Sequence, residues 1–361
     1  MTAQLGIHVK VLLVGPYPPP FGGISATVHD LRQFLLTQPS VAVKVLNIGE
    51  GRTIPSEEYL VANGPIAFIR TLLRFVRRGY LIHLETNGHN QKSWLTAFVC
   101  VVVGLFNGRK TIIAFGSGML PGYLKQCSVA HRFIARVTVR WAGCLIGRND
   151  EMVTALKIVG GAPDKIIVVP GFVGFSGRAS HPLPREVAEF CRRHDPVLGA
   201  AVTASPEYGI PLALQALARI RQDYRKVGLI LFGVGPEVAE TLPDLMPVRE
   251  HVLLAGVLSP NVARGVMSVL NVFLRPTYFD GDSVSVREAL ALGIPVVASA
   301  TGMRPASVVT FQVGNCDDLC EKILEVVKRG SIEPGNSIIR GGDQGSAKVL
   351  LGLYQRMQVR S

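Results

Sequence analysis

Short, continuous runs of apolar residues alternate along the first half of the chain with stretches whose apolar residues recur every three or four positions. Continuous apolar runs are typical of strands buried on both faces of a parallel sheet, and the wider spacing is that of helices. The predicted strands are Val9–Val14, Val41–Ile48, Leu81–Glu85, Thr111–Phe115, Gly143–Gly147 and Ile166–Val169. The predicted helices lie near Ser25–Leu36, Pro65–Arg78, Ser93–Phe106, Ser128–Ala142 and Glu151–Val159.

The same alternation starts again after residues 171–184, which are rich in Gly, Ser and Pro and which we interpret as a linker. Strands are predicted at Val197–Val202, Gly228–Phe232, Val252–Leu254, Val269–Leu274 and Pro295–Ala298. Helices are predicted near Pro211–Tyr224, Asn261–Ser268, Val284–Leu292, Asp317–Lys328 and Ser346–Met357. We therefore expect an α/β fold with two doubly wound, Rossmann-like domains, residues 1–178 and 179–335, facing a central cleft. A C-terminal helix within 336–361 can pack back on the first domain.

Composition separates the two halves. The chain has 361 residues, 48% of them hydrophobic and 18% charged, which excludes an intrinsically disordered protein. Its net charge is +12, and residues 1–178 account for +11 of it. Residues 65–140 hold 11 basic side chains and a single acid, Glu85. This asymmetry predicts an anionic partner for the first half.

Two predicted helices carry the excess charge at helical spacing. The arginines are Arg70, Arg74, Arg77 and Arg78 in one helix and Arg132, Arg136 and Arg140 in the other. A basic amphipathic helix suits an anionic membrane surface; the alternative is that each helix packs on a sheet and shows its arginines to water. Two such helices with one acid between them favour the membrane, and no nucleic-acid-binding motif accompanies the charge.

The remaining composition argues for a reducing compartment. The six cysteines form no CxxC pair, so we expect free thiols and neither disulfides nor a zinc site. The longest apolar stretch, Trp94–Phe106, has 13 residues, whereas a membrane-spanning helix needs about 20. No secretory signal is recognisable. We expect a cytoplasmic protein, peripheral on the inner face of the cell membrane.

Two loops could carry chemistry. In GPYPPPFGGIS (15–25), Gly22 and Gly23 precede a helix, and glycines there let the backbone approach an anion at the helix N-terminus. The segment FLRPTYFDGDSVSVREALALGIPVVAS (273–299) places Asp280 on a loop and Glu288 in the following helix. The N-terminus at Ser283 and Val284 can hold a diphosphate, and Glu288, about one and a half turns on, can accept hydrogen bonds from a ribose diol.

These motifs resemble those of GT-B glycosyltransferases of the family 4 type. The resemblance runs through VLLVGPYPPPFGGIS, EMVTALKIVGGAPDKIIVVPGFV, LILFGVGPE and RPTYFDGDSVSVREALALGIPVVAS. It implies a retaining transfer from a nucleotide-sugar donor bound by the second domain to an acceptor on the first. No metal or other cofactor is implied, although Asp280-Gly281-Asp282 is similar to the metal-binding DxD motif of another glycosyltransferase fold.

The resemblance also assigns residues. Asp280 and Glu288 would be the catalytic-site acids, acting by position and charge, with Asp280 on the transferred sugar and Glu288 on the ribose. The donor-binding set would be Gly22, Gly23, Gly233, Gly235, Arg275, Asp280, Gly281, Asp282, Ser283, Val284 and Glu288. The acceptor or sugar side would include His89, Lys92, Gly116 and Ser117.

The sequence departs from the family pattern at three polar positions. Gly116 stands where the family places a histidine, and Thr203 and Tyr208 stand where it places a phosphate-binding arginine and lysine. The candidate replacements are Arg275, and Lys92 or His89 in the loop after Leu81–Glu85. The resemblance, together with the basic first half, implies transfer of a sugar to a lipid-linked or saccharide acceptor in surface polysaccharide assembly. The alternative is a catalytically degenerate GT-B protein that acts as a partner or scaffold of another glycosyltransferase.

Overall fold

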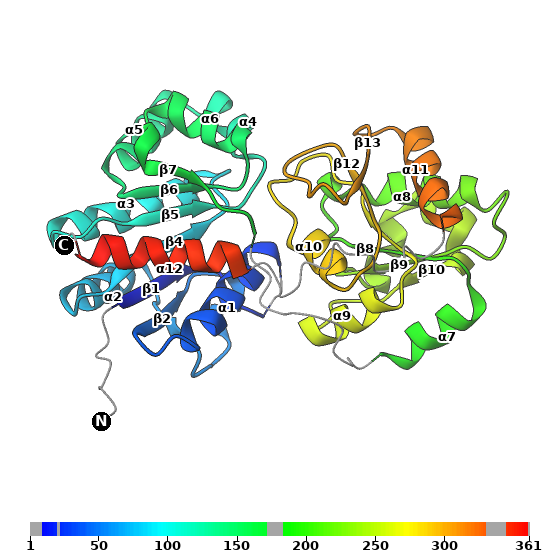
Figure 1. The fold of residues 1–361 in the computed structure, drawn as a ribbon, viewed down its shortest axis with the longest axis horizontal. Coiled ribbons are helices and arrows are strands. Elements are labelled where there is room, and N and C mark those ends of the chain that lie inside the picture. Colours follow the sequence, from blue (N-terminus) through cyan, green and yellow to red (C-terminus); the bar gives the residue numbers. More distant parts are fainter. Residues whose placement is uncertain (1–8, 20–21, 172–182, 330–343, 360–361) are drawn as a thin grey trace. The chain divides into compact units, whose positions relative to one another are not determined.

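The computed structural model describes residues 9–19, 22–171, 183–329 and 344–359. The chain forms two compact units (Figure 1). Unit 1 comprises Met1–Gly174 and Asp343–Ser361, and unit 2 comprises Phe175–Gly342. The predicted boundaries at 178/179 and 335/336 lie outside the described residues.

Unit 1 is built on a parallel sheet in the order β3-β2-β1-β4-β5-β6-β7. Its strands are β1 (Val9–Gly15), β2 (Val41–Asn47), β3 (Leu60–Val61), β4 (Leu81–Thr86), β5 (Ile112–Phe115), β6 (Cys144–Gly147) and β7 (Ile166–Val168). Its helices are α1 (Gly23–Leu36), α2 (Pro65–Arg77), α3 (Gln91–Phe106), α4 (Leu120–Gln126), α5 (Val129–Trp141), α6 (Asp150–Val159) and α12 (Gln344–Val359). The six strands predicted for this half are confirmed, while β3 and α4 were not anticipated.

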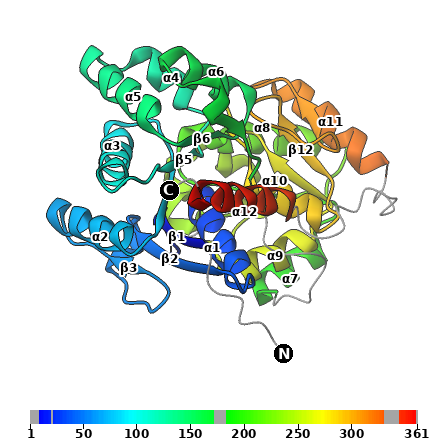
Figure 2. The ribbon, with the colours of Figure 1, turned by 60° about the vertical axis from the view of Figure 1, so that its left-hand side comes forward.

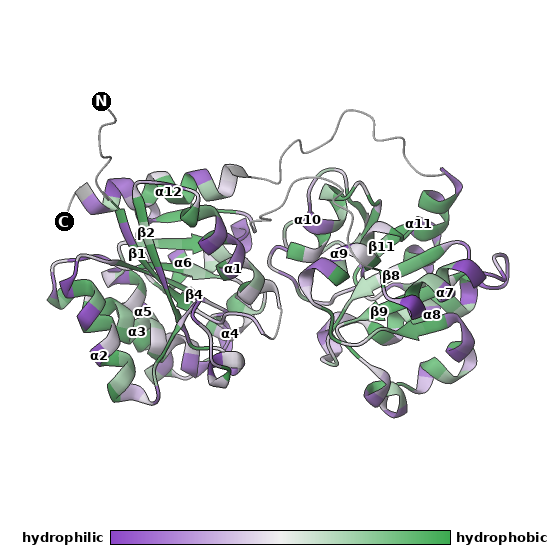
Figure 3. Cartoon of the chain, turned by 90° about the horizontal axis from the view of Figure 1, so that it is seen from below, coloured by the Kyte–Doolittle hydropathy of each residue, from purple (hydrophilic) through white to green (hydrophobic). Residues whose placement is uncertain are grey.

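The helices of unit 1 cover both faces of its sheet. Residues of α2, α3, α5 and α6 form one core with the sheet, and residues of α1 and α12 form the other. Figure 3 shows α12 on one side of the sheet and α2, α3 and α5 on the opposite side. A sheet buried on both faces explains why its strands are continuous apolar runs.

Unit 2 has a second parallel sheet, in the order β10-β9-β8-β11-β12-β13. Its strands are β8 (Val197–Ala201), β9 (Gly228–Phe232), β10 (Val252–Leu254), β11 (Val272–Arg275), β12 (Val296–Ser299) and β13 (Val309–Phe311). Its helices are α7 (Arg185–Arg193), α8 (Ile210–Ile220), α9 (Pro260–Ser268), α10 (Val284–Ala291) and α11 (Cys316–Lys328). The prediction of a second doubly wound sheet is confirmed.

Both sheets reverse their strand order beside their first strand. In unit 1 the second and fourth strands, β2 and β4, flank β1; in unit 2, β9 and β11 flank β8. Ligands of doubly wound folds bind beyond the carboxyl ends of the strands at this switch point. The loops after β1 and β4, and those after β8 and β11, are therefore where functional side chains are expected.

Candidate functional site

In unit 2, the carboxyl end of β11 carries a buried cluster of three charges. Arg275 ends the strand and Asp280 lies five residues on, and Arg275 Nε donates to Asp280 Oδ2 at 3.0 Å. Arg304, from the loop after β12, donates to the same oxygen from Nη1 at 2.9 Å. The Arg275 Nη1 group also donates to the Ala201 carbonyl at 3.2 Å, which joins the ends of β8 and β11. We call Arg275, Asp280 and Arg304 the charge triad.

The triad holds Asp280 ionised. Burial raises the pKa of this carboxyl, but Arg275 and Arg304 outweigh burial and hold the pKa below its usual value. Two cations and one anion leave the triad a net charge of +1. The geometry therefore shows Asp280 as an anchor for two guanidinium groups, while its predicted contact with the transferred sugar stays a prediction.

Position 208, where the sequence lacks an expected cation, lies beside this triad. The Arg275 guanidinium carbon is 4.8 Å from the centre of the Tyr208 ring, a distance typical of a cation–π contact. A cation therefore lies next to position 208, supplied by Arg275 at the end of β11. Thr203 lies in the loop that follows β8. Gly209, at the end of this loop, has φ 66° in the left-handed region and brings the loop against β11. A Cβ at Gly209 would lie 2.0 Å from the Pro276 carbonyl oxygen, so only glycine fits.

Helix α10 begins directly after the triad. Ser283 is its N-cap, and the Ser283 hydroxyl accepts a hydrogen bond from Val286 N at 3.4 Å. Val284 is the first helical residue, as predicted, so its N-terminus and dipole lie at the sheet's carboxyl edge. Glu288 lies in the next turn, mostly buried, and its Oε1 accepts from Arg264 Nε of α9 at 3.3 Å.

The neighbouring acid of the DGD sequence has a structural partner. Asp282 is buried and both its oxygens accept from Arg287 Nε, at 2.9 and 3.0 Å. Across the described ranges, no three His, Cys, Asp or Glu side chains gather as metal ligands. Gly281 donates its backbone N–H to Asp280 Oδ1 at 3.1 Å. The turn at 280–282 therefore orders its carboxylates around arginines.

The predicted loop Gly233–Pro236 follows β9, next to β8. Gly233 has φ 99° and its N–H donates to the Gly256 carbonyl at 2.7 Å. Gly235 N donates to Glu237 Oε1 at 2.9 Å. Both glycines thus lie at the carboxyl edge of the same sheet as the triad, one strand away from β8.

In unit 1, the loops after β1, β4 and β5 meet at the carboxyl edge. Gly22 is the extended N-cap of α1, and neither Gly22 nor Gly23 has φ in the left-handed region. Among the described residues, a Cβ at Gly23 would meet no atom within 4 Å, and a Cβ at Gly22 would meet only Ser25 Oγ, at 3.9 Å. Open space beside both glycines is what close approach of a ligand requires.

The loop after β4 presents His89 on a well-braced turn. Gly88 adopts φ 74°, and its carbonyl accepts from the Trp94 indole N–H at 3.0 Å. Asn90 caps α3 by accepting from Ser93 N at 2.9 Å. His89 Nδ1 lies 2.8 Å from the hydroxyl of Ser117, which follows β5. The structure thus brings three of the four predicted acceptor-side residues to one edge, His89, Ser117 and its neighbour Gly116, while Lys92 is exposed in the first turn of α3.

Gly116 has a packing reason to be glycine. A Cβ there would lie 2.8 Å from Ile24 Cγ1 of α1, so a larger side chain would have to displace Ile24. The space that a histidine at this position would use is thereby taken, and His89 on the adjacent loop is the imidazole at this edge.

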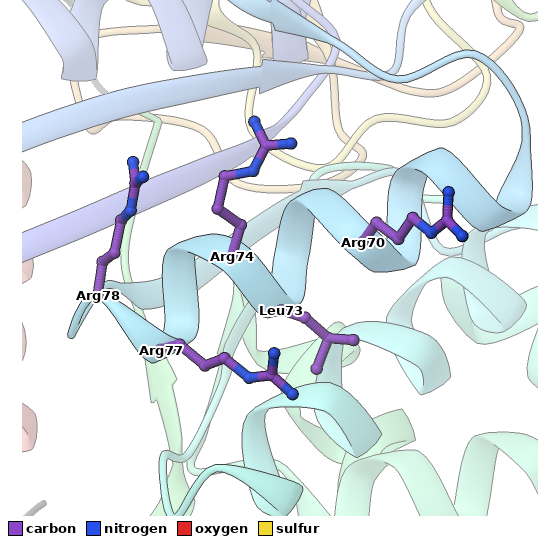
Figure 4. A pocket seen from close by; sticks show the side chains of 5 residues that line it. All are labelled: Arg70, Leu73, Arg74, Arg77 and Arg78. Atoms are coloured by element: carbon purple, nitrogen blue, oxygen red, sulfur yellow. The ribbon is translucent and has the colours of Figure 1, made fainter.

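The seven arginines predicted to face a membrane are all exposed on α2 and α5 or at their ends. The four arginines of the first group and Leu73 line a shallow hollow on α2 (Figure 4). None of the seven makes an ion pair with any residue that the structure describes. Among the described helices, none is both long and apolar enough to cross a bilayer.

Sequence reasoning named Arg275 but missed two other arginines that bind Asp280 and Glu288. Arg304 and Arg264 each lie 24 residues from their carboxylate partners. Neither belongs to a motif, so only the fold reveals them.

Comparison with known proteins gives a family match for part of the chain and similar structures for nearly all of it. Residues 195–329 match the model of the family "Glycosyl transferases group 1". No curated protein matches the sequence. Sucrose-phosphate synthase from Thermosynechococcus elongatus is similar in structure, with a TM-score of 0.73, 16% identity, and 98% of this chain and 100% of that chain covered.

Two further structures show how widely this fold is used. Anabaena HepE, in complex with UDP-glucose, has a TM-score of 0.69 and 18% identity over 96% of this chain and 100% of its own. A putative UDP-N-acetylglucosamine 2-epimerase from Listeria monocytogenes has a TM-score of 0.62 and 14% identity over 98% and 97%. At such identities the structural likeness shows the fold alone. The family match adds the type of domain for residues 195–329. Residues 195–329 therefore match the family "Glycosyl transferases group 1", and the chain as a whole has the two-sheet GT-B fold of its structural neighbours.

Proposed function

We propose that the chain is a retaining glycosyltransferase that moves a sugar from a nucleotide-sugar donor to a lipid-linked or saccharide acceptor in surface polysaccharide assembly. The observation that carries this proposal is the charge triad, Arg275, Asp280 and Arg304, directly before the N-terminus of α10. A net positive cluster and a helix N-terminus at one sheet edge are both suited to a diphosphate.

In this proposal the triad does the work of the cations missing at Thr203 and Tyr208. Arg275 and Arg304 stabilise the negative charge that grows on the diphosphate as the sugar leaves, and Asp280 holds both guanidinium groups in position. Glu288 accepts hydrogen bonds from the ribose, and Arg264 orients its carboxylate. No metal is assigned to the reaction.

Donor binding is the first test. We would measure thermal stabilisation and binding of UDP-, GDP-, ADP- and CMP-sugars, with Glu288→Ala as the control. UDP-sugars come first, because a structural neighbour was solved with UDP-glucose. Stabilisation by one donor that is lost in Glu288→Ala is expected, since a ligand stabilises the state it binds.

The same assay addresses the second candidate function, a degenerate GT-B protein that supports another glycosyltransferase. Thr203, Tyr208 and Gly116 favour it, because three polar side chains of the family pattern are absent. If the protein is well folded but none of the donors binds or stabilises it, the enzyme proposal is rejected in favour of this second function.

We further propose that the chain works at the inner face of the cell membrane, against anionic lipid. Seven exposed arginines without ion pairs among the described residues support this contact. Changing Arg70, Arg74, Arg77 and Arg78 to Gln should weaken binding to anionic vesicles, most of all at low salt. Equal binding by variant and wild type would mean that these arginines face water and do not bind lipid.

A further inference from the structure

Helices α2, α3 and α5 form one layer on a face of the unit 1 sheet. Helix α3 packs against both α2 and α5, and these two have no comparable contact with each other. Figure 2 shows the same order, with α3 between its two neighbours. The outward side of α3 is therefore the centre of this layer.

The centre of the layer is apolar. No charged residue occurs from Ser93 to Asn107, although Leu95 and Phe106 are exposed, Phe106 to 83%. Val99 and Val102 are half-buried between them, at positions that share one side of a helix. A solvent-facing helix normally carries polar residues along its outer side, whereas the exposed polar residues of α3 are confined to its first turn, at Gln91 and Lys92.

The neighbouring helices extend this surface. On α5, Val129 is 85% and Phe133 is 67% exposed, and Trp141 is exposed at its end. On α2, Ile66 is exposed. We call these exposed apolar residues of α2, α3 and α5 the apolar ridge: Ile66, Leu95, Phe106, Val129, Phe133 and Trp141.

Helices α2, α3 and α5 contain basic residues and no Asp or Glu. Arginines stand on α2 and on α5, on either side of α3, and none of these arginines is ion-paired within the described chain. An isologous contact with a second copy would bring like charges together and is disfavoured. An anionic bilayer offers both complements, acyl chains for the ridge and phosphates for the arginines.

We propose that α3 and the apolar ridge insert into the outer part of one leaflet, with the arginines of α2 and α5 bound to anionic headgroups on either side. Helix α3 lies along the surface and does not cross it, because it has 16 residues. The proposal rests on the proposed membrane location, and it adds that apolar insertion, and not charge alone, holds the protein there.

The test uses the full chain and vesicles of phosphatidylcholine with or without phosphatidylglycerol. We expect the double variant Phe106→Ser/Phe133→Ser to bind the anionic vesicles at least tenfold more weakly than wild type does. The difference should remain at 0.5 M salt, because screening weakens the contacts of the arginines but not apolar insertion. Both side chains are largely exposed, so the fold should persist. Met246→Ser, at a residue 75% exposed in unit 2, is the matched control and should bind like wild type.

Tryptophan fluorescence gives a second readout. The chain has two tryptophans, and Trp94 is buried, so a blue shift upon vesicle addition reports on the exposed Trp141. The shift should vanish in Trp141→Phe. Unchanged Trp141 emission together with wild-type binding by the double variant would overturn the insertion.

Two other outcomes are distinguishable. A dimer in sedimentation experiments that Phe133→Ser dissociates would overturn the proposal and make the ridge an interface between copies. Donor binding, measured without vesicles, is independent of the ridge. Its failure would reject the proposed transfer reaction and leave the membrane result standing.

Discussion

Replacing Asp280 by Asn tests whether this residue anchors the charge triad. The carboxylate is 8% exposed and accepts from Arg275 and Arg304 at 3.0 and 2.9 Å. Removing one partner of a buried ion pair costs about 3–5 kcal/mol, because the remaining charge is left uncompensated. Here two guanidinium groups would face each other, so we expect unit 2 to lose about 3–5 kcal/mol of stability.

The assay is urea unfolding of the full chain at pH 7, followed by two signals. Both tryptophans lie in unit 1, so their fluorescence reports on that unit, whereas circular dichroism reports on both. The unfolding of unit 2 is therefore the part of the dichroism change that has no counterpart in fluorescence. We expect Asp280→Asn to move this part to a lower urea concentration and to leave the fluorescence transition unchanged. Glu189→Gln is the control, because the Glu189–Arg185 pair is exposed and worth less than about 0.5 kcal/mol.

The pH dependence sharpens this prediction. Because the pKa of Asp280 is lowered in the folded protein, its contribution is complete above the ordinary aspartate pKa and is lost as the pH falls through the folded value. The difference between wild type and Asp280→Asn should therefore persist from pH 7 to about pH 4 and close in stronger acid. A difference below about 1 kcal/mol at pH 7 would refute the anchoring role.

Other predictions concern single residues in both units. Glu288→Ala should weaken nucleotide binding at least tenfold in calorimetry with an unchanged circular dichroism spectrum, and wild-type affinity would reject the ribose contact. His89→Gln should lower the transfer rate at least tenfold without changing donor affinity, because His89 lies in unit 1 beside Ser117; an unchanged rate would remove it from the acceptor site. Burial lowers the pKa of His83 to about 4, so wild type should lose roughly 3 kcal/mol of stability as the pH falls from 6.5 towards 4. In thermal unfolding, the stability of His83→Asn should lack this loss between pH 6.5 and 4. Parallel stability–pH profiles of wild type and variant would show that His83 does not cause the loss.

The periodicity of apolar residues was enough to predict the fold. Strands such as β9 and β10 have the predicted bounds, because continuous apolar runs between helices are specific for parallel sheets. Helix α7 was missed, since only Val187 and Phe190 of its nine residues are buried and its surface is highly charged. Strand β3 has two residues, too few for any pattern.

The candidate site was predicted only where it is local in sequence. The N-cap at Ser283 and the position of Glu288 in the following turn follow from helix geometry. The roles of Asp280 and Arg275 depend on Arg304, which approaches from the loop after another strand. Likewise, the contact that makes Gly116 a glycine comes from Ile24 of α1. Such contacts between distant segments leave no mark on local spacing.

The position of α12 has a consequence for synthesis of the chain. This helix follows all of unit 2, yet Ala347, Leu350 and Tyr354 are buried in unit 1, and the Tyr354 hydroxyl lies 2.5 Å from His83 Nδ1 in strand β4. A nascent chain must therefore complete unit 2 before the sheet face of unit 1 can be covered. Until then apolar side chains of β1 and α1 that α12 later buries remain exposed, so this face of unit 1 is the last part of its core to be completed.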